Sequence, residues 1–167
     1  MSFVNDLKQG EEYEQRVKEA LRREWWIQLE KNEDKKWIDL VHPIMQLEVK
    51  KDRWVNRTGN YFFEYMNNGK KWGIFAYGEN SVRATFFGVW NDDEFLLFYL
   101  PHLQRLFYEW IEDGKYRVVK NAGDGWRVSW ILVPSEDLKQ EALYIINLNN
   151  NDLHKQPTTI QQEELSD

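Results

Sequence analysis

The sequence predicts one mixed α/β domain, an α+β arrangement in which short strands are interleaved with a few helices. Two segments have helical periodicity, and between and after them short apolar runs alternate with polar turns. With 167 residues the chain has the usual length of one domain, and 42% hydrophobic residues are enough for a core. We expect a single domain over residues 1–146 and a loosely ordered polar tail over residues 147–167.

The first predicted element is a helix near the N-terminus. Tyr13, Val17, Ala20 and Leu21 recur at i, i+4, i+7 and i+8, which places them on one face of a helix. Glu14 lies beside Leu21 at the edge of this apolar stripe. Glu14 is therefore the acidic residue of this helix best placed to face whatever the helix packs against.

The middle of the chain contains predicted strands, each bounded by polar or glycine-containing turns. The expected strands are residues 25–30, 36–41, 45–51, 61–66, 72–77, 84–90 and 95–100. Residues 53–60 have the composition of a polar loop. The segment Asn67-Asn68-Gly69-Lys70 is a hairpin signal, because Asn and Gly tolerate the left-handed backbone that tight hairpin turns need.

A second helix is predicted after Pro101, because proline suits the first helical turn and apolar residues follow at helical spacing. Gly114 is the expected end of that helix. Residues 116–120 and 126–133 should form another hairpin. Ser135 is a plausible cap for a last short helix that extends to about Tyr144.

Composition excludes several classes of protein. A net charge of −6 argues against a general nucleic-acid coat protein, although residues 50–71 contain six basic residues against two acidic ones. The absence of cysteine excludes disulfides and thiolate metal sites. No apolar run approaches 18 residues, so no membrane span is expected. The N-terminus lacks a basic-then-apolar signal pattern, and a cytoplasmic protein is the expectation.

The candidate catalytic residues lie on the predicted strand 45–51. Glu48 and Lys50 are two positions apart and point to the same face, while Leu47 and Val49 point to the other. Asp39, nine residues before Glu48, supplies a second carboxylate from the neighbouring strand. Asp39 and Glu48 are suitable Mg²⁺ ligands, and the Val49 carbonyl is a reasonable third.

This arrangement matches the needs of metal-dependent phosphodiester hydrolysis. Lys50 can orient or help deprotonate the attacking water, or neutralise charge on the phosphate, and the sequence does not choose between these roles. Glu14 can hold a second ion or an outer-shell water from the helix. Basic residues in the polar loop and on either side of it are candidates for contacts with DNA phosphates. These residues are Lys51, Arg53, Arg57, Lys70 and Lys71.

The order and spacing of these residues resemble the PD-(D/E)XK nuclease superfamily. The matching motifs are Gly10-x-x-x-Glu14 on a helix, Asp39 on a strand, Glu48-x-Lys50 on the next strand, Thr58 to Glu64, Gly73-Ile74 and Val133-Pro134. The resemblance spans residues 10–138. The chain departs from the pattern at Ile38, where the family has proline.

The resemblance implies a restriction-endonuclease-like core, in which a central mixed β-sheet is flanked by helices, here with additional β-hairpins. It also implies DNA as the substrate, Mg²⁺ as the cofactor with Mn²⁺ as a possible substitute, and Glu14, Asp39, Glu48 and Lys50 as catalytic residues. A small nuclease with one site per chain usually cuts both strands by pairing subunits. We therefore expect a homodimer or a higher homo-oligomer.

Two alternatives remain open at this stage. The chain can be a catalytically inactive relative that binds DNA or a protein partner, which the acidic composition favours. It can also be an unrelated α+β interaction protein in which Asp39, Glu48 and Lys50 never converge. A Glu and a Lys on an exposed strand are often no more than a solvated pair.

Overall fold

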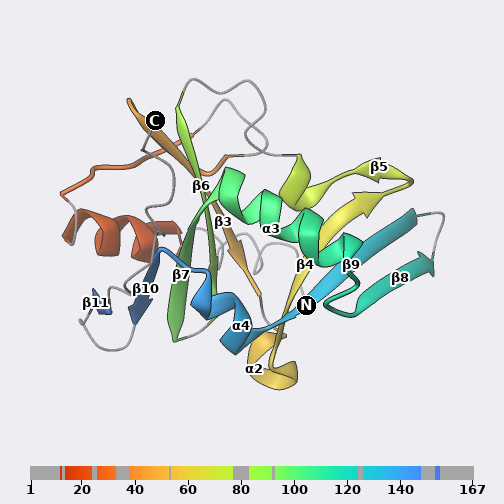
Figure 1. The fold of residues 1–167 in the computed structure, drawn as a ribbon. Coiled ribbons are helices and arrows are strands. Elements are labelled where there is room, and N and C mark those ends of the chain that lie inside the picture. The colour runs from red at the N-terminus through yellow and green to blue at the C-terminus, as the bar shows by residue number, and fades with distance from the viewer. Residues whose placement is uncertain are drawn as a thin grey trace, which may run out of the picture.

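Two β-sheets and a few helices make up the part of the chain that the computed structural model describes, which is residues 12, 14–23, 26–32, 38–52, 54–76, 83–91, 93–123, 126–147 and 153–154. Figure 1 shows their arrangement. Within these residues the large sheet has the order β1-β2-β3-β6-β7-β10-β11 and the small sheet the order β5-β4-β9-β8. The fold is therefore mixed α/β, as predicted.

The large sheet is itself mixed. Its strands are β1 (Glu30–Lys31), β2 (Leu40–His42), β3 (Met45–Lys51), β6 (Ala84–Trp90), β7 (Glu94–Tyr99), β10 (Tyr144–Asn147) and β11 (Leu153–His154). β3 pairs antiparallel with β2 and parallel with β6. The other described neighbours in this sheet are antiparallel. Parallel pairing requires a long connection from β3 to β6.

That connection carries the first half of the small sheet. It contains the short helix α2 (Val55–Thr58), the hairpin of β4 (Asn60–Asn67) and β5 (Lys70–Lys71), and the 3₁₀ helix η1 (Gly73–Phe75). The small sheet is completed by β8 (Val118–Gly123) and β9 (Trp126–Pro134). β9 pairs with both β4 and β8. The crossover thus places β4 close to the end of β3.

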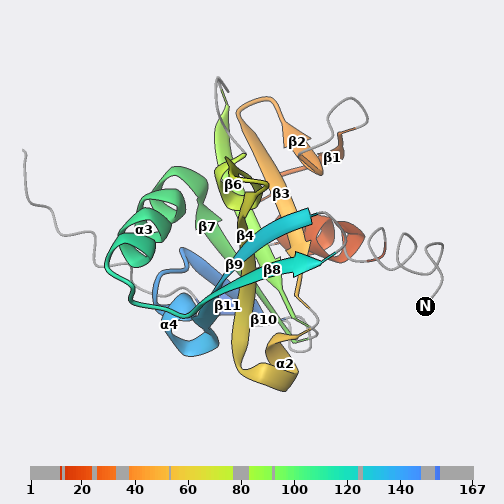
Figure 2. The same cartoon turned by 90° about the vertical axis from the view of Figure 1, so that its right-hand side faces the viewer.

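The two faces of the large sheet are covered by different elements (Figure 2). On one face, Val17 and Leu21 of the N-terminal helix (residues 14–23) share a buried cluster with Leu47. On the other face, α3 (Leu100–Glu112) and the small sheet enclose a second cluster, which includes Phe87 and Phe107. No helix among the described residues has both the length and the hydrophobicity needed to span a bilayer.

Several predicted elements are confirmed. The N-terminal helix, the strand at residues 45–51, the hairpin of β6 and β7, and the hairpin of β8 and β9 are all present. α3 begins at Leu100, directly before Pro101, and Gly114 follows its end with a φ of 62°. The turn between β4 and β5 has positive φ at Asn68 and Gly69, as the Asn-Gly signal predicts.

The predicted polar loop at residues 53–60 contains the helix α2, so that prediction is wrong over Val55–Thr58. Asp52 explains the difference, because its carboxylate accepts the N–H of Trp54 at 2.7 Å just before the helix begins. The helix ends at Gly59, which has a φ of 73° and donates its N–H to the Val55 carbonyl. Gly59 thus forms a left-handed cap.

The predicted strand at residues 72–77 is also wrong, because β5 ends at Lys71 and η1 follows it. Gly73 has a φ of 55°, and a Cβ there would lie 2.1 Å from the Glu64 carbonyl oxygen. Such a close backbone approach is possible only for glycine, and it turns the chain out of the hairpin. The approach joins segments distant in sequence, which no local pattern reveals.

Three further differences concern the first strand pair, the last helix and the C-terminal tail. Among the described residues, the first strand pair is shorter than predicted, because there only Glu30–Lys31 pairs with β2. The last helix, α4 (Ser135–Gln140), stops before the predicted end at Tyr144, and Tyr144 begins β10 instead. Within the segment predicted to be a loose tail, β11 pairs with β10, and most of the remaining tail lies outside the described residues.

Candidate active site and the adjoining cleft

Glu48 and Lys50 form an ion pair on β3, with the Lys50 Nζ 2.6 Å from the Glu48 Oε1. The side chain of Glu48 is only 2% exposed, whereas that of Lys50 is 53% exposed. In the parallel register, Glu48 lies beside Phe87 and Lys50 beside Val89. The prediction that both side chains share one face is confirmed. A buried carboxylate is costly without a cation, and the Lys50 ammonium supplies one while it reaches solvent.

Asp39 lies directly before β2 and is hydrogen-bonded to the residues on either side of Glu48. Its N–H donates to the Leu47 carbonyl at 3.2 Å, and its Oδ2 accepts the Val49 N–H at 2.7 Å. The structure therefore brings Asp39 beside Glu48, as the sequence predicts. Among the described residues, the other carboxylate oxygen of Asp39 makes no hydrogen bond or ion pair.

The backbone N–H of Val49 faces the side of β3 on which Asp39 lies. In an extended strand the N–H and C=O of one residue point to the same side. The Val49 carbonyl thus points to the side of β3 on which Asp39 lies. Two carboxylates and a carbonyl are hard oxygen donors, which fits the small number of protein ligands that Mg²⁺ takes while it keeps several waters. In the described part of the chain, no group of three or more His, Cys, Asp or Glu side chains is arranged to hold a metal ion.

Glu14 lies on a helix that packs against the opposite face of the large sheet. The buried residues of that helix cluster with Leu47, which points away from the face of Glu48 and Lys50. The side chain of Glu14 is half-buried. The helix that carries Glu14 is therefore separated from the Glu48–Lys50 pair by the sheet, and its catalytic role stays a prediction.

The described members of the predicted DNA-binding set lie on three elements, β3, α2 and β5. The Lys51 ammonium lies 5.3 Å from the centre of the Trp90 ring. Arg57, exposed on α2, has its guanidinium 5.9 Å from the centre of the Trp54 ring. Lys70 and Lys71 are exposed on β5, and the Lys71 ammonium donates to the Tyr108 hydroxyl. Arg53 lies outside the described residues.

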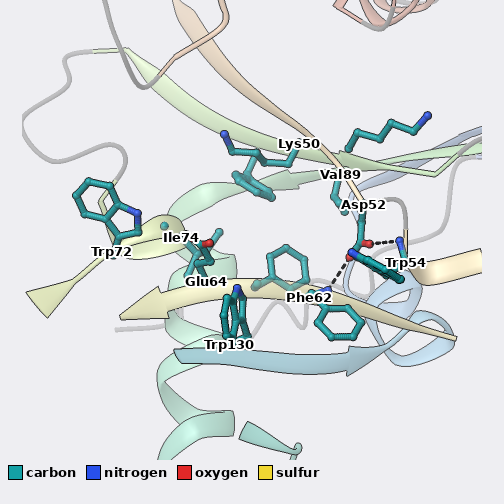
Figure 3. A pocket seen from close by; sticks show the side chains of 13 residues that line it. Lys50, Asp52, Trp54, Phe62, Glu64, Trp72, Ile74, Val89 and Trp130 are labelled. Atoms are coloured by element: carbon teal, nitrogen blue, oxygen red, sulfur yellow. Dashed lines mark hydrogen bonds between the residues drawn. The ribbon is translucent and has the colours of Figure 1, made fainter. Parts of the chain in front are cut away.

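A cleft of about 460 Å³ opens beside Lys50, between β3 and β6 on one side and β4 and β9 on the other. We call it the inter-sheet cleft. Figure 3 shows Lys50 on one wall and Glu64 on the other, with Trp72 and Trp54 at opposite ends. Trp130 of β9 also lines it, directly across the ladder from Glu64. Sequence reasoning missed this cleft, because it forms between segments that only the crossover brings together.

Asp52 holds the wall of the inter-sheet cleft in place. Its two carboxylate oxygens accept the N–H groups of Trp54 and Phe62, each at 2.7 Å. Burial raises the pKa of the Asp52 carboxyl above its ordinary value, and the backbone hydrogen bonds oppose this shift. Asp52 thus ties the end of β3 to α2 and β4, and its oxygens are committed to the backbone.

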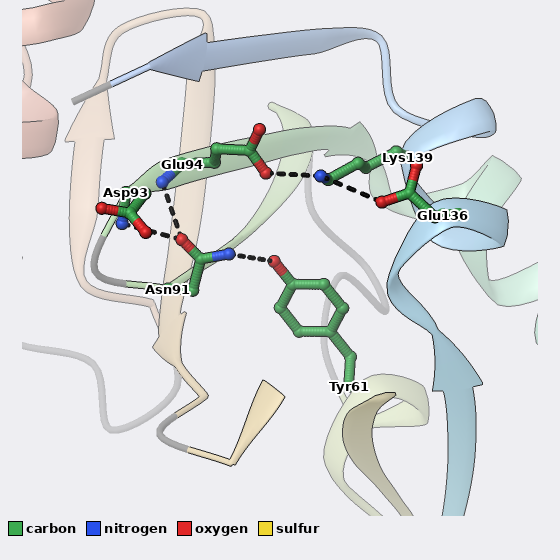
Figure 4. A network of polar contacts seen from close by, with 6 residues as sticks. All are labelled: Tyr61, Asn91, Asp93, Glu94, Glu136 and Lys139. Carbon is green, nitrogen blue, oxygen red and sulfur yellow. Dashed lines mark hydrogen bonds and ion pairs between the residues drawn. The ribbon is translucent and has the colours of Figure 1, made fainter. Parts of the chain in front are cut away.

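A second polar network joins β4 to the large sheet and α4 (Figure 4). The side-chain amide of Asn91 donates to the Tyr61 hydroxyl at 3.2 Å, and the Asn91 Oδ1 accepts the Glu94 N–H at 2.7 Å. Lys139 of α4 bridges Glu94 at 2.8 Å and Glu136 at 3.3 Å. Burial, followed by the nearby Glu94 charge, raises the pKa of the Tyr61 phenol. This network ties β4 to the turn between β6 and β7, and ties β7 to α4.

Comparisons with known proteins add no relative to this description. No family model, no curated protein and no solved structure matches the chain.

Proposed function

We propose that the protein is a Mg²⁺-dependent DNA endonuclease that hydrolyses phosphodiester bonds. The observation that carries this proposal is the arrangement around Glu48. Asp39 is hydrogen-bonded to both sequence neighbours of Glu48, and Glu48 itself is ion-paired with Lys50. Two carboxylates and a lysine on adjacent strands are the residue types that the PD-(D/E)XK resemblance implies.

The fold is compatible with a restriction-endonuclease-like core. A mixed sheet carries Glu48 and Lys50, and Asp39 lies directly before β2 of the same sheet. The N-terminal helix covers one face of this sheet, and α3 covers the other. The small sheet would then be an insertion in the connection between β3 and β6. This insertion supplies one wall of the inter-sheet cleft, which opens beside Lys50.

Each residue has a definite part in the proposed reaction. Asp39, Glu48 and the Val49 carbonyl would hold a divalent cation, which when bound lowers the pKa of a coordinated water and polarises the phosphoryl oxygens. Lys50 is anchored by Glu48 at 2.6 Å and is half exposed. It therefore presents a fixed ammonium to the substrate phosphate and stabilises the negative charge that develops in the transition state.

Nicking of supercoiled plasmid in Mg²⁺, with and without a chelator, tests the proposal. Glu48→Gln and Lys50→Ala should each reduce the nicking rate by about a hundredfold or more, as expected for the loss of a group that stabilises transition-state charge. Glu109→Gln and Lys120→Ala, at exposed positions distant in sequence from these residues, are matched controls and should cut at the wild-type rate. Absence of metal-dependent nicking, or full activity of the Glu48 and Lys50 variants, would overturn the proposal.

A second candidate is a catalytically inactive relative that binds DNA or a protein. One observation favours it, because one Asp39 oxygen is already committed to the Val49 N–H and Glu48 is buried against Lys50. Binding of DNA without cleavage in either Mg²⁺ or Mn²⁺ would support this candidate. The oligomeric state, measured by analytical ultracentrifugation, tests the expected homodimer separately.

A further inference from the structure

We propose that the inter-sheet cleft holds an unstacked nucleobase, so that the preferred substrate is DNA with a single-stranded segment rather than continuous duplex. This inference rests on the proposed nuclease function, because it places the bound base next to Lys50. It concerns the aromatic walls of the cleft and Glu64, neither of which is part of the proposed catalytic set.

The walls of the cleft suit a flat aromatic ligand. Phe63 and Phe87 belong to the buried core and form an apolar floor. Trp54, Trp72 and Trp130 line the same space, and Trp54 is 55% exposed. The volume of about 460 Å³ falls within the range of small-molecule sites. Aromatic side chains bind bases of single strands by stacking, which is independent of sequence.

Glu64 supplies one acceptor within these aromatic walls. Its side chain is exposed to the cleft, and within the described residues its carboxylate makes no hydrogen bond or ion pair. The backbone at Glu64 is held by the close approach of Gly73. A carboxylate repels phosphate and accepts hydrogen bonds from amines, such as the exocyclic N4 amine of cytosine. The chemistry of this position therefore favours the edge of a base over the sugar-phosphate backbone.

Basic groups lie on one wall of the cleft and at its α2 end. Lys50 lines the cleft with a side chain that is 53% exposed, and the Arg57 guanidinium lies 5.9 Å from the centre of the Trp54 ring. A DNA strand that places one base between the walls can therefore set its phosphates against these two cations. Bases in a continuous duplex are stacked and cannot enter the cleft without flipping out.

Fluorescence anisotropy with short labelled oligonucleotides in a chelating buffer tests this inference without cleavage. Wild-type protein should bind oligo(dC) at least tenfold more tightly than a duplex of equal length. Trp54→Ala and Trp130→Ala should each weaken oligo(dC) binding about 5- to 150-fold, the range for loss of one stacked base. Trp26→Ala is the matched control, since Trp26 is 91% exposed and lies outside the cleft, and its binding should be unchanged.

Glu64→Gln tests base recognition. The wild type should prefer oligo(dC) to oligo(dT), because thymine presents a carbonyl oxygen where cytosine presents an amine. Glu64→Gln should narrow this preference and leave oligo(dT) binding unchanged, whereas Glu109→Gln should leave both unchanged. Loss of nicking in Glu64→Gln with unaltered oligonucleotide binding would instead assign Glu64 to the chemistry and overturn its role in base recognition.

The outcomes separate this inference from the proposed function. Equal binding of duplex and oligo(dC), or wild-type binding by Trp54→Ala, overturns the inference even if plasmid nicking is intact. Absence of nicking with a retained single-strand preference overturns the nuclease proposal and leaves the cleft as a binding site. If Trp130→Ala lowers the melting temperature, Trp130→Phe should restore binding, and failure of this aromatic replacement to do so would exclude stacking at that position.

Discussion

Replacement of Lys50 by Met should destabilise the fold, because it removes the ammonium that lies 2.6 Å from the buried Glu48 carboxylate. Breaking a fully buried ion pair costs about 3–5 kcal/mol. The Glu48 side chain is 2% exposed, but that of Lys50 is 53% exposed, so water already screens part of the attraction. We therefore expect a decrease of about 2 kcal/mol in the free energy of unfolding, about half of the fully buried value. For a domain of this size, that corresponds to a decrease of about 4–8 °C in Tm.

Urea unfolding followed by tryptophan fluorescence measures this effect, and a double-mutant cycle isolates its cause. Glu48→Gln alone should cost about 1 kcal/mol or less, because it removes the charge and leaves a lysine that water can solvate. The double variant should be as stable as Glu48→Gln, because without the Glu48 charge the Met substitution removes no ion-pair attraction. Lys70→Met, at an exposed position on β5, is the control and should change stability by less than about 0.5 kcal/mol.

Two results would refute this reasoning. One is wild-type stability of Lys50→Met, which would mean that Glu48 does not depend on the ammonium. The other is a double variant that is no more stable than Lys50→Met, which would assign the loss to packing of the lysine stem. A coupling energy near zero would also remove the structural basis for a fixed ammonium at the candidate site.

Three further predictions follow from other positions. The pKa of Asp52 is raised in the folded state, so the folded state keeps the proton to higher pH, and the free energy of unfolding should fall as pH rises above about 3.8. Asp52→Asn should lack this pH dependence in urea unfolding measured at several pH values. The variant should also be less stable at neutral pH, because one hydrogen-bond acceptor is lost. Gly73→Ala should lower the free energy of unfolding by at least about 2 kcal/mol, because the φ of Gly73 is 55° and the added Cβ would meet the Glu64 carbonyl oxygen. Gly69→Ala, which has open space around it, should lower it by about 1 kcal/mol, and equal melting temperatures of the two variants would contradict this. Glu14→Gln should reduce plasmid nicking less than loss of either carboxylate beside β3, and an equal loss would place Glu14 in direct contact with the chemistry.

Regular local patterns in the sequence correctly predicted most of the helices and strands. The periodicity around Val17 and Leu21 identified the first helix, and the apolar runs at 84–90 and 95–100 identified a hairpin. The predictions that failed did so for two different reasons. The segment predicted as a loop contains α2, because the Asp52 carboxylate accepts the N–H of Trp54, which is a local contact. The approach of Gly73 to Glu64 joins distant segments and ends the hairpin that periodicity extended to residue 77.

The candidate site also has one part that the local sequence predicts and another that depends on tertiary contacts. The two-residue alternation placed Glu48 and Lys50 on one face, and this needed no tertiary information. The position of Asp39 beside them depended on the pairing of β2 with β3. The face covered by the helix of Glu14, and the existence of the inter-sheet cleft, depended on how the elements pack.

The sequence by itself determined the mixed α/β class, the main helices and strands, and the shared face of Glu48 and Lys50, because backbone sterics and side-chain periodicity act over a few residues. Only the tertiary structure decided that Glu48 is buried and ion-paired with Lys50, and that one carboxylate oxygen of Asp39 accepts the Val49 N–H. It also decided which tryptophans line one cleft, namely Trp54, Trp72 and Trp130. The physical reason is the parallel pairing of β3 with β6, which forces a long crossover and carries β4 across the end of β3. Burial and desolvation at that junction depend on segments separated by tens of residues, and no local pattern encodes them.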